Sequence, residues 1–268
     1  MCTLEIRPVK EGIWNFVEVQ AMGNNPQQRH EIDAYLICGQ NRAIMFDTLQ
    51  SVRGLYEKVR ELTSLPIDVV ISHGHGDHYG AATGEFLSAG CPVYLNHGDW
   101  PLLTQPDGQP FPAGHFQELE DGQVFDLGGR VLTAMLMPGH TPAGDVLLDQ
   151  AEGLVFTGDA IGSGHFWMQL PTSVTIEELL PAVEKLAAQI KAWGKDVLIL
   201  AGHRYQSPVP LTFGYVEDVL HLLRGLLDGT LQGETMSMDL HGRHIDCCTI
   251  AHGGMLGMLY DPQKIHRA

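Results

Sequence analysis

The segment His73-Gly74-His75-Gly76-Asp77-His78 directly follows an apolar run at 69–71 and places four side chains that can bind a metal within six residues. Imidazole and carboxylate groups are the ligands that zinc and other transition metals prefer. In an extended chain, side chains two residues apart point to the same face, so His73 and His75 can bind one ion together. Asp77 and His78 come as the chain turns and can face a second ion. The segment therefore predicts a metal site rather than an ordinary polar loop.

Three further polar residues each follow an apolar stretch and a glycine: His140, Asp159 and His203. Any one of them alone would more often be a capping or core residue. Ligand sites in layered α/β proteins gather at strand ends, where loops bring reactive groups to a rigid sheet. The glycines permit tight turns and a close approach of the backbone. Together these junctions indicate side chains that converge on one site.

This pattern resembles the metallo-β-lactamase-fold metallohydrolases, whose motifs run H-x-H-x-D-H, then His, then Asp, then His. The resemblance extends from Asp47 to His203. It implies an α/β fold, a four-layer αβ/βα sandwich with the metals at one end of both sheets. It also implies two metal ions, the first bound by His73, His75 and His140, the second by Asp77, His78 and His203, with Asp159 bridging them.

Length and composition suit one large α/β domain over residues 1–268, and no linker-like stretch divides the chain. Residues 1–10 contain no apolar leader, and no run approaches eighteen apolar residues, so we expect a cytoplasmic protein without a membrane span. The five cysteines are odd in number and lack zinc-ribbon spacing, and we interpret them as free thiols.

The formal net charge of −16 argues against a nucleic-acid partner, which would require basic surface. It does not exclude an anionic small-molecule substrate, because two bound cations would dominate the local field. A leucine-rich segment at 211–231 could contact a second copy in a homodimer or simply pack on the sheet.

Hydrophobic periodicity and turn residues predict the elements that carry these loops. We expect a strand hairpin over 32–47 turning at 39–41, helices over 52–62, 80–90 and 215–227, and a strand over 91–95. The run Thr175-Ile176-Glu177-Glu178 indicates a capping box that opens a helix ending at Gly194. The strands at 68–71 and 196–199 echo each other, as a duplicated unit would.

The predicted reaction is hydrolysis of an ester, thioester or lactone of a small molecule. Metal binding lowers the pKa of water, so a hydroxide held between two metals could attack a carbonyl carbon. Asp77 is the candidate to orient this nucleophile and carry its proton, and Tyr205 or Tyr79 could donate a hydrogen bond to a substrate oxygen. The resemblance assigns Asp47 to holding a ligand histidine through its other ring nitrogen.

Specificity is less well defined by the sequence. The stretch 162–168, which follows Asp159, could provide a mobile approach and an aromatic pocket, or a hinge and a hydrophobic plug. A second wall could be formed by His97, Trp100, Phe111, His115 and Phe116. The remaining histidines are interpreted as ordinary surface or core residues, namely His30, His221, His241, His244, His252 and His266.

Within the family, the chain resembles the acyl-homoserine lactonases in its ligand spacing, with 62 residues from His78 to His140 and 44 from Asp159 to His203. It lacks the tyrosine that those lactonases carry soon after the bridging aspartate. The basic glutathione-binding residues of glyoxalase II find no match. A small-molecule phosphodiesterase and an iron-dependent oxidoreductase of the same fold remain alternatives. Zinc is the default metal, with iron or manganese also suited to nitrogen and oxygen ligands.

Overall fold

The computed structural model describes residues 2–21, 29–104, 113–207, 209–240, 243–252 and 256–267. Its first seven strands form one sheet in chain order, antiparallel as far as the fourth strand and parallel from there on. These strands are β1 Cys2–Lys10, β2 Ile13–Ala21, β3 Arg29–Cys38, β4 Ala43–Phe46, β5 Ile67–Val70, β6 Val93–Leu95 and β7 Gln117–Glu118. Helices α1 (Leu55–Leu62) and α2 (Thr83–Ser88) cover its outer face through side chains such as Val59 and Phe86.

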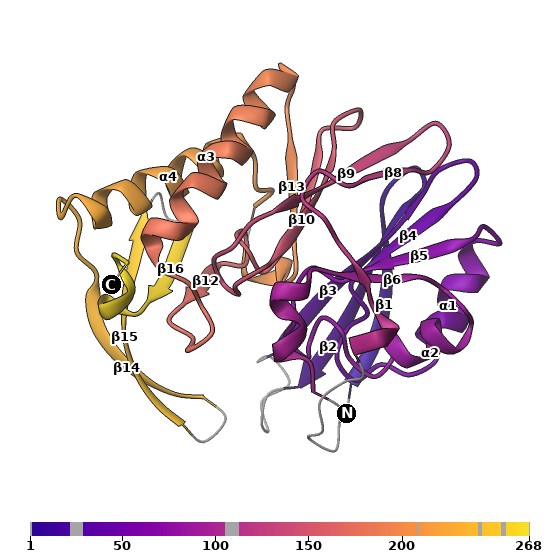
Figure 1. The fold of residues 1–268 in the computed structure, drawn as a ribbon, viewed down its shortest axis with the longest axis horizontal. Helices are drawn as coiled ribbons and strands as arrows, with labels where there is room; N and C mark the ends of the chain where they lie inside the picture. Colours follow the sequence, from indigo (N-terminus) through magenta and orange to yellow (C-terminus); the bar gives the residue numbers. More distant parts are fainter. Residues whose placement is uncertain are drawn as a thin grey trace.

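A second, five-stranded sheet packs against the first (Figure 1). Its order is β13-β11-β10-β9-β8, with β8 Val124–Asp126, β9 Val131–Leu136, β10 Asp145–Asp149, β11 Leu154–Gly158 and β13 Leu198–Ala201. The core between the sheets includes an aromatic cluster, in which the Phe156 ring lies 5.3 Å from Tyr35 and 6.1 Å from Phe46, measured between centroids.

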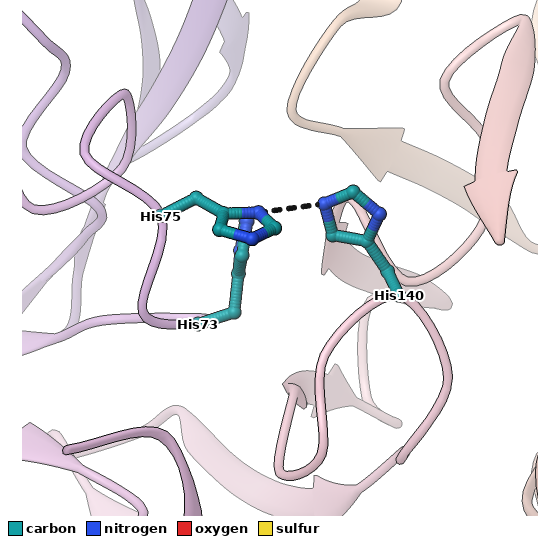
Figure 2. Close-up of side chains that lie close together, drawn as sticks. All are labelled: His73, His75 and His140. Atoms are coloured by element: carbon teal, nitrogen blue, oxygen red, sulfur yellow. Dashed lines mark hydrogen bonds between the residues drawn. The ribbon is translucent and has the colours of Figure 1, made fainter. Parts of the chain in front are cut away.

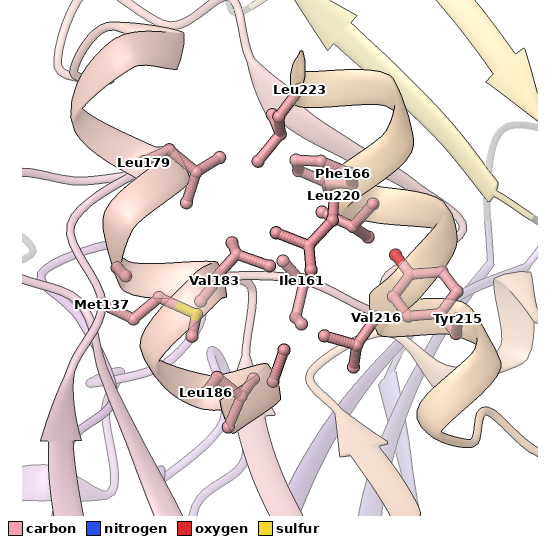
Figure 3. Packing of buried hydrophobic residues seen from close by; sticks show 14 of the residues in the cluster. Met137, Ile161, Phe166, Leu179, Val183, Leu186, Tyr215, Val216, Leu220 and Leu223 are labelled. Carbon is pink, nitrogen blue, oxygen red and sulfur yellow. The ribbon is translucent and has the colours of Figure 1, made fainter. Parts of the chain in front are cut away.

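Helices α3 (Ile176–Trp193) and α4 (Phe213–Leu227) cover the outer face of the second sheet. In Figure 3 side chains of both helices, among them Leu179, Val183 and Val216, meet over Ile161 and Met137. The molecule thus has helix, sheet, sheet and helix layers, and the predicted four-layer αβ/βα sandwich is confirmed. The parallel strand pairs β4–β5 and β11–β13 bring their carboxyl ends, and the loops after them, to one end of the sandwich.

A third sheet, which the sequence patterns did not indicate, is formed mainly by the C-terminal part of the chain. Its order is β12-β16-β15-β14, with β12 His165–Met168, β14 Glu234–Leu240, β15 Arg243–His252 and β16 Leu256–Tyr260. Phe166 and Met168 of β12, each 1% exposed, join the core beneath α3 and α4. The β14–β15 hairpin curves away from the body of the molecule (Figure 1).

The predicted elements are present, and several are shorter than expected. The α1 helix begins at Leu55 rather than residue 52, after Gly54 in a left-handed conformation (φ 75°). The α2 helix starts at Thr83 rather than residue 80, and before it the amide of Gly80 bonds to the carbonyl oxygen of Leu49 at 2.8 Å. The predicted 91–95 strand is β6, Val93–Leu95. The short connections include 3₁₀ turns His97–Leu102, Ala113–His115, Arg204–Gln206 and Pro262–Lys264.

The capping box before α3 is confirmed. The Thr175 hydroxyl accepts from the amide of Glu178, whose carboxylate in turn accepts from the Thr175 amide, and Gly194 ends the helix with φ 62°. The α4 helix packs on α3 and on β15 and β16. Among the described residues no helix has the length and apolarity to cross a bilayer. All five cysteines are free.

Candidate metal centre

The first group of metal-capable side chains joins the two sheets. His73 and His75 lie on the loop after β5, and His140 lies on the loop between β9 and β10. Figure 2 shows the three imidazoles pointing toward one another across this boundary, with His75 Nδ1 2.9 Å from His140 Nε2. One ligand atom from each lies within 4.8 Å of the others, so the group can hold a metal ion.

The second group consists of Asp77, His78, Asp159 and His203, whose ligand atoms also lie within 4.8 Å of one another. His203 Nε2 lies 3.5 Å from Asp77 Oδ2 and 3.3 Å from Asp159 Oδ2. His78 Nε2 lies 3.5 Å from Asp159 Oδ1. All seven residues predicted as ligands are therefore brought together in two groups.

Asp159 lies between the two groups. Its Oδ2 is 3.8 Å from His140 Nε2 in the first group and 3.3 Å from His203 Nε2 in the second. A carboxylate with two oxygens can bind two neighbouring cations. This is the position that the resemblance implied for a bridging residue.

Asp47 fixes the orientation of His78. Its Oδ2 lies 2.8 Å from His78 Nδ1, which leaves Nε2 directed at the centre. The same carboxylate accepts hydrogen bonds from the amide of Ser72 at 2.7 Å and its hydroxyl at 2.9 Å. Ser72 in turn lies 2.9 Å from Nδ1 of His73. The predicted role of Asp47 in holding a histidine matches this geometry.

Backbone carbonyl groups orient two more histidines. The carbonyl oxygen of Trp167 lies 2.7 Å from His140 Nδ1, and that of Glu31 lies 2.7 Å from His203 Nδ1. In each case Nε2 is the nitrogen left facing the centre. The Trp167 contact connects the third sheet to the first group, a link that sequence reasoning missed.

The donor atoms fit metal ions. Nε2 of His73 and of His78 are buried and have no hydrogen-bond partner among the described residues. An unpaired buried polar atom is costly, and one metal ion in each group would satisfy these nitrogens. The set of nitrogen and oxygen donors suits zinc, iron or manganese.

Two glycines and a buried aspartate allow the loops to approach this closely. A Cβ atom at Gly202 would lie 2.6 Å from Asp159 Oδ1 and 2.6 Å from His78 Cε1. A Cβ at Gly158 would lie 2.4 Å from the Ser72 hydroxyl oxygen, and its φ is +50°. Asp99, which is fully buried, accepts from the amides of Gly74 and Ala143 at 2.9 Å each and so ties the two ligand loops together.

The pKa values of the histidines differ between the two groups. Burial, reinforced by neighbouring imidazoles, holds the pKa of His73 well below its usual value and lowers the pKa of His75 to about 3. Burial also disfavours charge on His78 and His203, but the surrounding carboxylates, Asp159 first among them, together outweigh it and raise the pKa of both. The same histidines lower the pKa of Asp77 and Asp159 against the effect of burial. The carboxylates are therefore ready to bind a cation in place of protons.

The two tyrosines predicted near the substrate lie in different environments. Tyr79 is 4% exposed, and its hydroxyl donates to the carbonyl oxygen of Thr104 at 3.1 Å, which favours a packing role. Tyr205 is 38% exposed, and its hydroxyl lies 3.1 Å from His30 Nδ1. His30 was interpreted as an ordinary histidine, yet its ring lies 4.9 Å from that of His203. Burial and the neighbouring His203 lower its pKa.

The residues of the two segments proposed for specificity also lie in different environments. Phe166 and Met168 belong to the core, which contradicts an aromatic pocket formed by the whole 162–168 stretch and agrees with a plug. Ser163 instead donates to Asp159 Oδ1 at 3.2 Å. In the suggested second wall, His97 is exposed and bonded to Glu118, and Phe116 is buried in the first core. Phe111 and His241 lie outside the described residues.

The remaining histidines match their interpretation as ordinary residues. His221 and His252 stack with ring centroids 4.6 Å apart, and His252 Nε2 lies 3.6 Å from Asp218 Oδ1. His244 pairs with Asp239 on the exposed hairpin, and His266 lies at the surface near Glu177.

The fold and the paired groups place two neighbouring sets of metal-capable side chains at one end of the sandwich. The family model of the metallo-β-lactamase superfamily matches residues 29–208. The chain belongs to this superfamily. Among solved structures, the metallo-β-lactamase from Pontibacter korlensis superposes with a TM-score of 0.63 at 15% identity, over 83% of this chain and 99% of that one. The FIM-1 enzyme of Pseudomonas aeruginosa, solved in a mono-zinc form, gives 0.64 at 18% identity, over 82% and 95%.

The relatives identified by sequence match this chain over only part of their length. The lactamase-like protein nscB of Arthroderma gypseum is 29% identical over 153 residues, which cover 55% of this chain and 45% of that protein. The atrochrysone carboxyl ACP thioesterase nsrC of Aspergillus novofumigatus is 29% identical over 153 residues, or 54% and 44%. The matches thus span about half the length of these curated relatives.

Proposed function

We propose that the protein hydrolyses an ester, thioester or lactone of a small molecule, and that a thioester is the preferred substrate. The observation that carries the proposal is the meeting of the two groups at Asp159, whose carboxylate contacts both His140 and His203. Two divalent ions bound there would lower the pKa of a water molecule and polarise a carbonyl oxygen. The relative named as an ACP thioesterase supports the thioester.

Asp77 is the proposed proton acceptor. Its side chain is 27% exposed, compared with 12% for Asp159, so it faces the more open side of the centre. His78 and His203 lower its pKa, although burial opposes ionisation, and the carboxylate is charged at neutral pH. It can accept a hydrogen bond from a water molecule at the centre, orient it and take its proton.

We propose zinc as the metal. We also propose that the partner is a small molecule, because the chain carries a net charge of −16 and offers little basic surface for a polyanion. The five free thiols agree with the proposed cytoplasmic location. A homodimer remains a possible assembly in this proposal, although eight α4 residues are buried within the chain itself.

The proposal is tested by initial rates of the metal-loaded protein on an acyl thioester, a homoserine lactone, an aryl ester and an aryl phosphodiester. Chelator-sensitive turnover of the carbonyl compounds, fastest with the thioester, is the expected result. Turnover of the phosphodiester alone would move the protein to phosphoryl transfer. Bound iron with visible absorption and no hydrolysis would favour an oxidoreductase instead. An Asp159→Asn variant, which keeps the shape of the side chain, serves as the matched inactive control.

A further inference from the structure

His30 lies beside the second group without belonging to it. It is on β3, and its ring is stacked over that of His203, with centroids 4.9 Å apart and an interplanar angle of 36°. The charges on Asp77 and Asp159 are close enough to act on it. His30 is half-buried, and neither of the two metal-binding groups includes it.

A short hydrogen-bond chain holds the other edge of the ring. Gln206 Nε2 donates to the Tyr205 hydroxyl oxygen at 3.1 Å, and that oxygen lies 3.1 Å from His30 Nδ1. An amide nitrogen can only donate, so the Tyr205 oxygen accepts from Gln206, and its own hydrogen remains free to be donated to His30 Nδ1. If Nδ1 accepts this hydrogen, the ring hydrogen of His30 lies on Nε2.

We infer that His30 is a substrate-binding residue that donates a hydrogen bond from Nε2 to an oxygen of the acyl substrate, and that Tyr205 is the positioning residue which fixes this tautomer. The inference rests on the proposed hydrolysis of an acyl compound. Negative charge develops on oxygen as water adds to a carbonyl carbon, and an N–H group held in place stabilises that charge. Tyr205 was predicted to donate to the substrate itself. Its hydroxyl instead faces His30.

Two substitutions at one position separate this role from simple packing. His30→Gln places an N–H group near the original Nε2, whereas His30→Asn places one near Nδ1 and leaves the Nε2 position empty. We expect His30→Asn to lower kcat on the thioester about 10²-fold, with unchanged metal content and little change in KM. His30→Gln should recover most of this loss. His266→Gln, a histidine to glutamine change at the surface, is the matched control. Equal kcat in His30→Asn and wild type would overturn the inference.

The tautomer has its own readout, independent of turnover. Long-range ¹H–¹⁵N spectra of the metal-free protein should show His30 with a protonated Nε2 and an unprotonated Nδ1, and Tyr205→Phe should abolish this uniform pattern. A protonated Nδ1 with a bare Nε2 would refute the assignment. A wild-type protein inactive on every acyl substrate would remove the proposed function and the substrate role of His30 together, while the spectrum would still decide the hydrogen-bond assignment.

Discussion

At the scale of single residues, Asp77 is the more exposed of the two carboxylates in the second group, and its pKa is lowered. Asp77→Asn keeps the size of the side chain but removes the charge that can accept a proton. We expect turnover to fall at least about 10²-fold, with the fold intact by circular dichroism. Asp68→Asn, which alters a carboxylate paired with Arg42 away from the centre, is the control. Near-normal turnover in Asp77→Asn would exclude Asp77 from proton transfer.

Gly202 is the residue where a single methyl group should disable the centre. A Cβ atom there would lie 2.6 Å from both Asp159 Oδ1 and His78 Cε1, which is too close for either to keep its place. Gly202→Ala should therefore bind metal much more weakly, by the factor of about 10–100 typical of disturbed ligand support. Competition with a metal chelator measures this affinity. Gly76→Ala, on the ligand loop but with open space around the position, is the matched control and should bind normally.

The residue types and their spacing were enough to single out all seven ligand candidates, because four lie in one histidine- and glycine-rich segment and the other three directly follow a glycine. His30 could not be found this way. It occurs as an isolated histidine near the start of a strand, and its approach to His203 depends on how β3 packs beside the loop after β13. The local sequence does not indicate that contact.

At the scale of elements, helix ends with side-chain caps were predicted well, whereas ends set by distant contacts were not. The start of α3 is encoded by Thr175 and Glu178 within the same turn. Before α2, the amides of Gly80 and Ala81 bond to Leu49 and Gln50, residues distant in sequence, and the helix starts only at Thr83. The third sheet went unpredicted for the same reason: β12 pairs in parallel with β16, about ninety residues later in the chain.

The capping box gives a prediction at this scale. Thr175→Ala removes the hydroxyl that accepts from the Glu178 amide and should lower the free energy of unfolding by about 1 kcal/mol. Urea unfolding followed by circular dichroism measures the change. Thr172→Ala, three residues earlier and outside the helix, is the control and should have a smaller effect. If both variants lose the same stability, the cap is not the cause.

At the scale of the whole molecule, the centre joins the two halves of the sandwich. His73 and His75 follow a strand of the first sheet, while His140, Asp159 and His203 follow strands of the second. A metal ion bound to both halves is a ligand of the folded state alone, because the unfolded chain does not bring these residues together. Metal binding should therefore raise the stability of the whole chain.

The size of this stabilisation should depend on pH, and the direction follows from His78 and His203. The Asp159 carboxylate raises the pKa of both in the metal-free protein, against the effect of burial. A histidine whose pKa is raised on folding stabilises the folded protein. This stabilisation is complete below about pH 6.5, the pKa of histidine in the unfolded chain, and is lost as pH rises through the pKa of the folded protein. The lowered pKa values of Asp77 and Asp159 act only at acid pH and add a constant amount here.

The lowered pKa values of His73 and His75 act in the opposite direction, but both residues are neutral in the folded and the unfolded chain above about pH 7.5. The metal-free protein should therefore melt at lower temperature as pH rises from about 7.5 to about 8.5, while bound metal replaces the protons and holds the same carboxylates. The gain in Tm on adding zinc to chelator-treated protein is expected to grow over this interval. Differential scanning calorimetry at a series of pH values measures it. Asp159→Asn, which removes the main charge acting on both histidines, should show a small gain with little pH dependence. A gain that is equal at every pH in the wild type would mean that protons and metal do not compete for the nitrogens of His78 and His203, and that the two groups do not act as the metal centre inferred from their geometry.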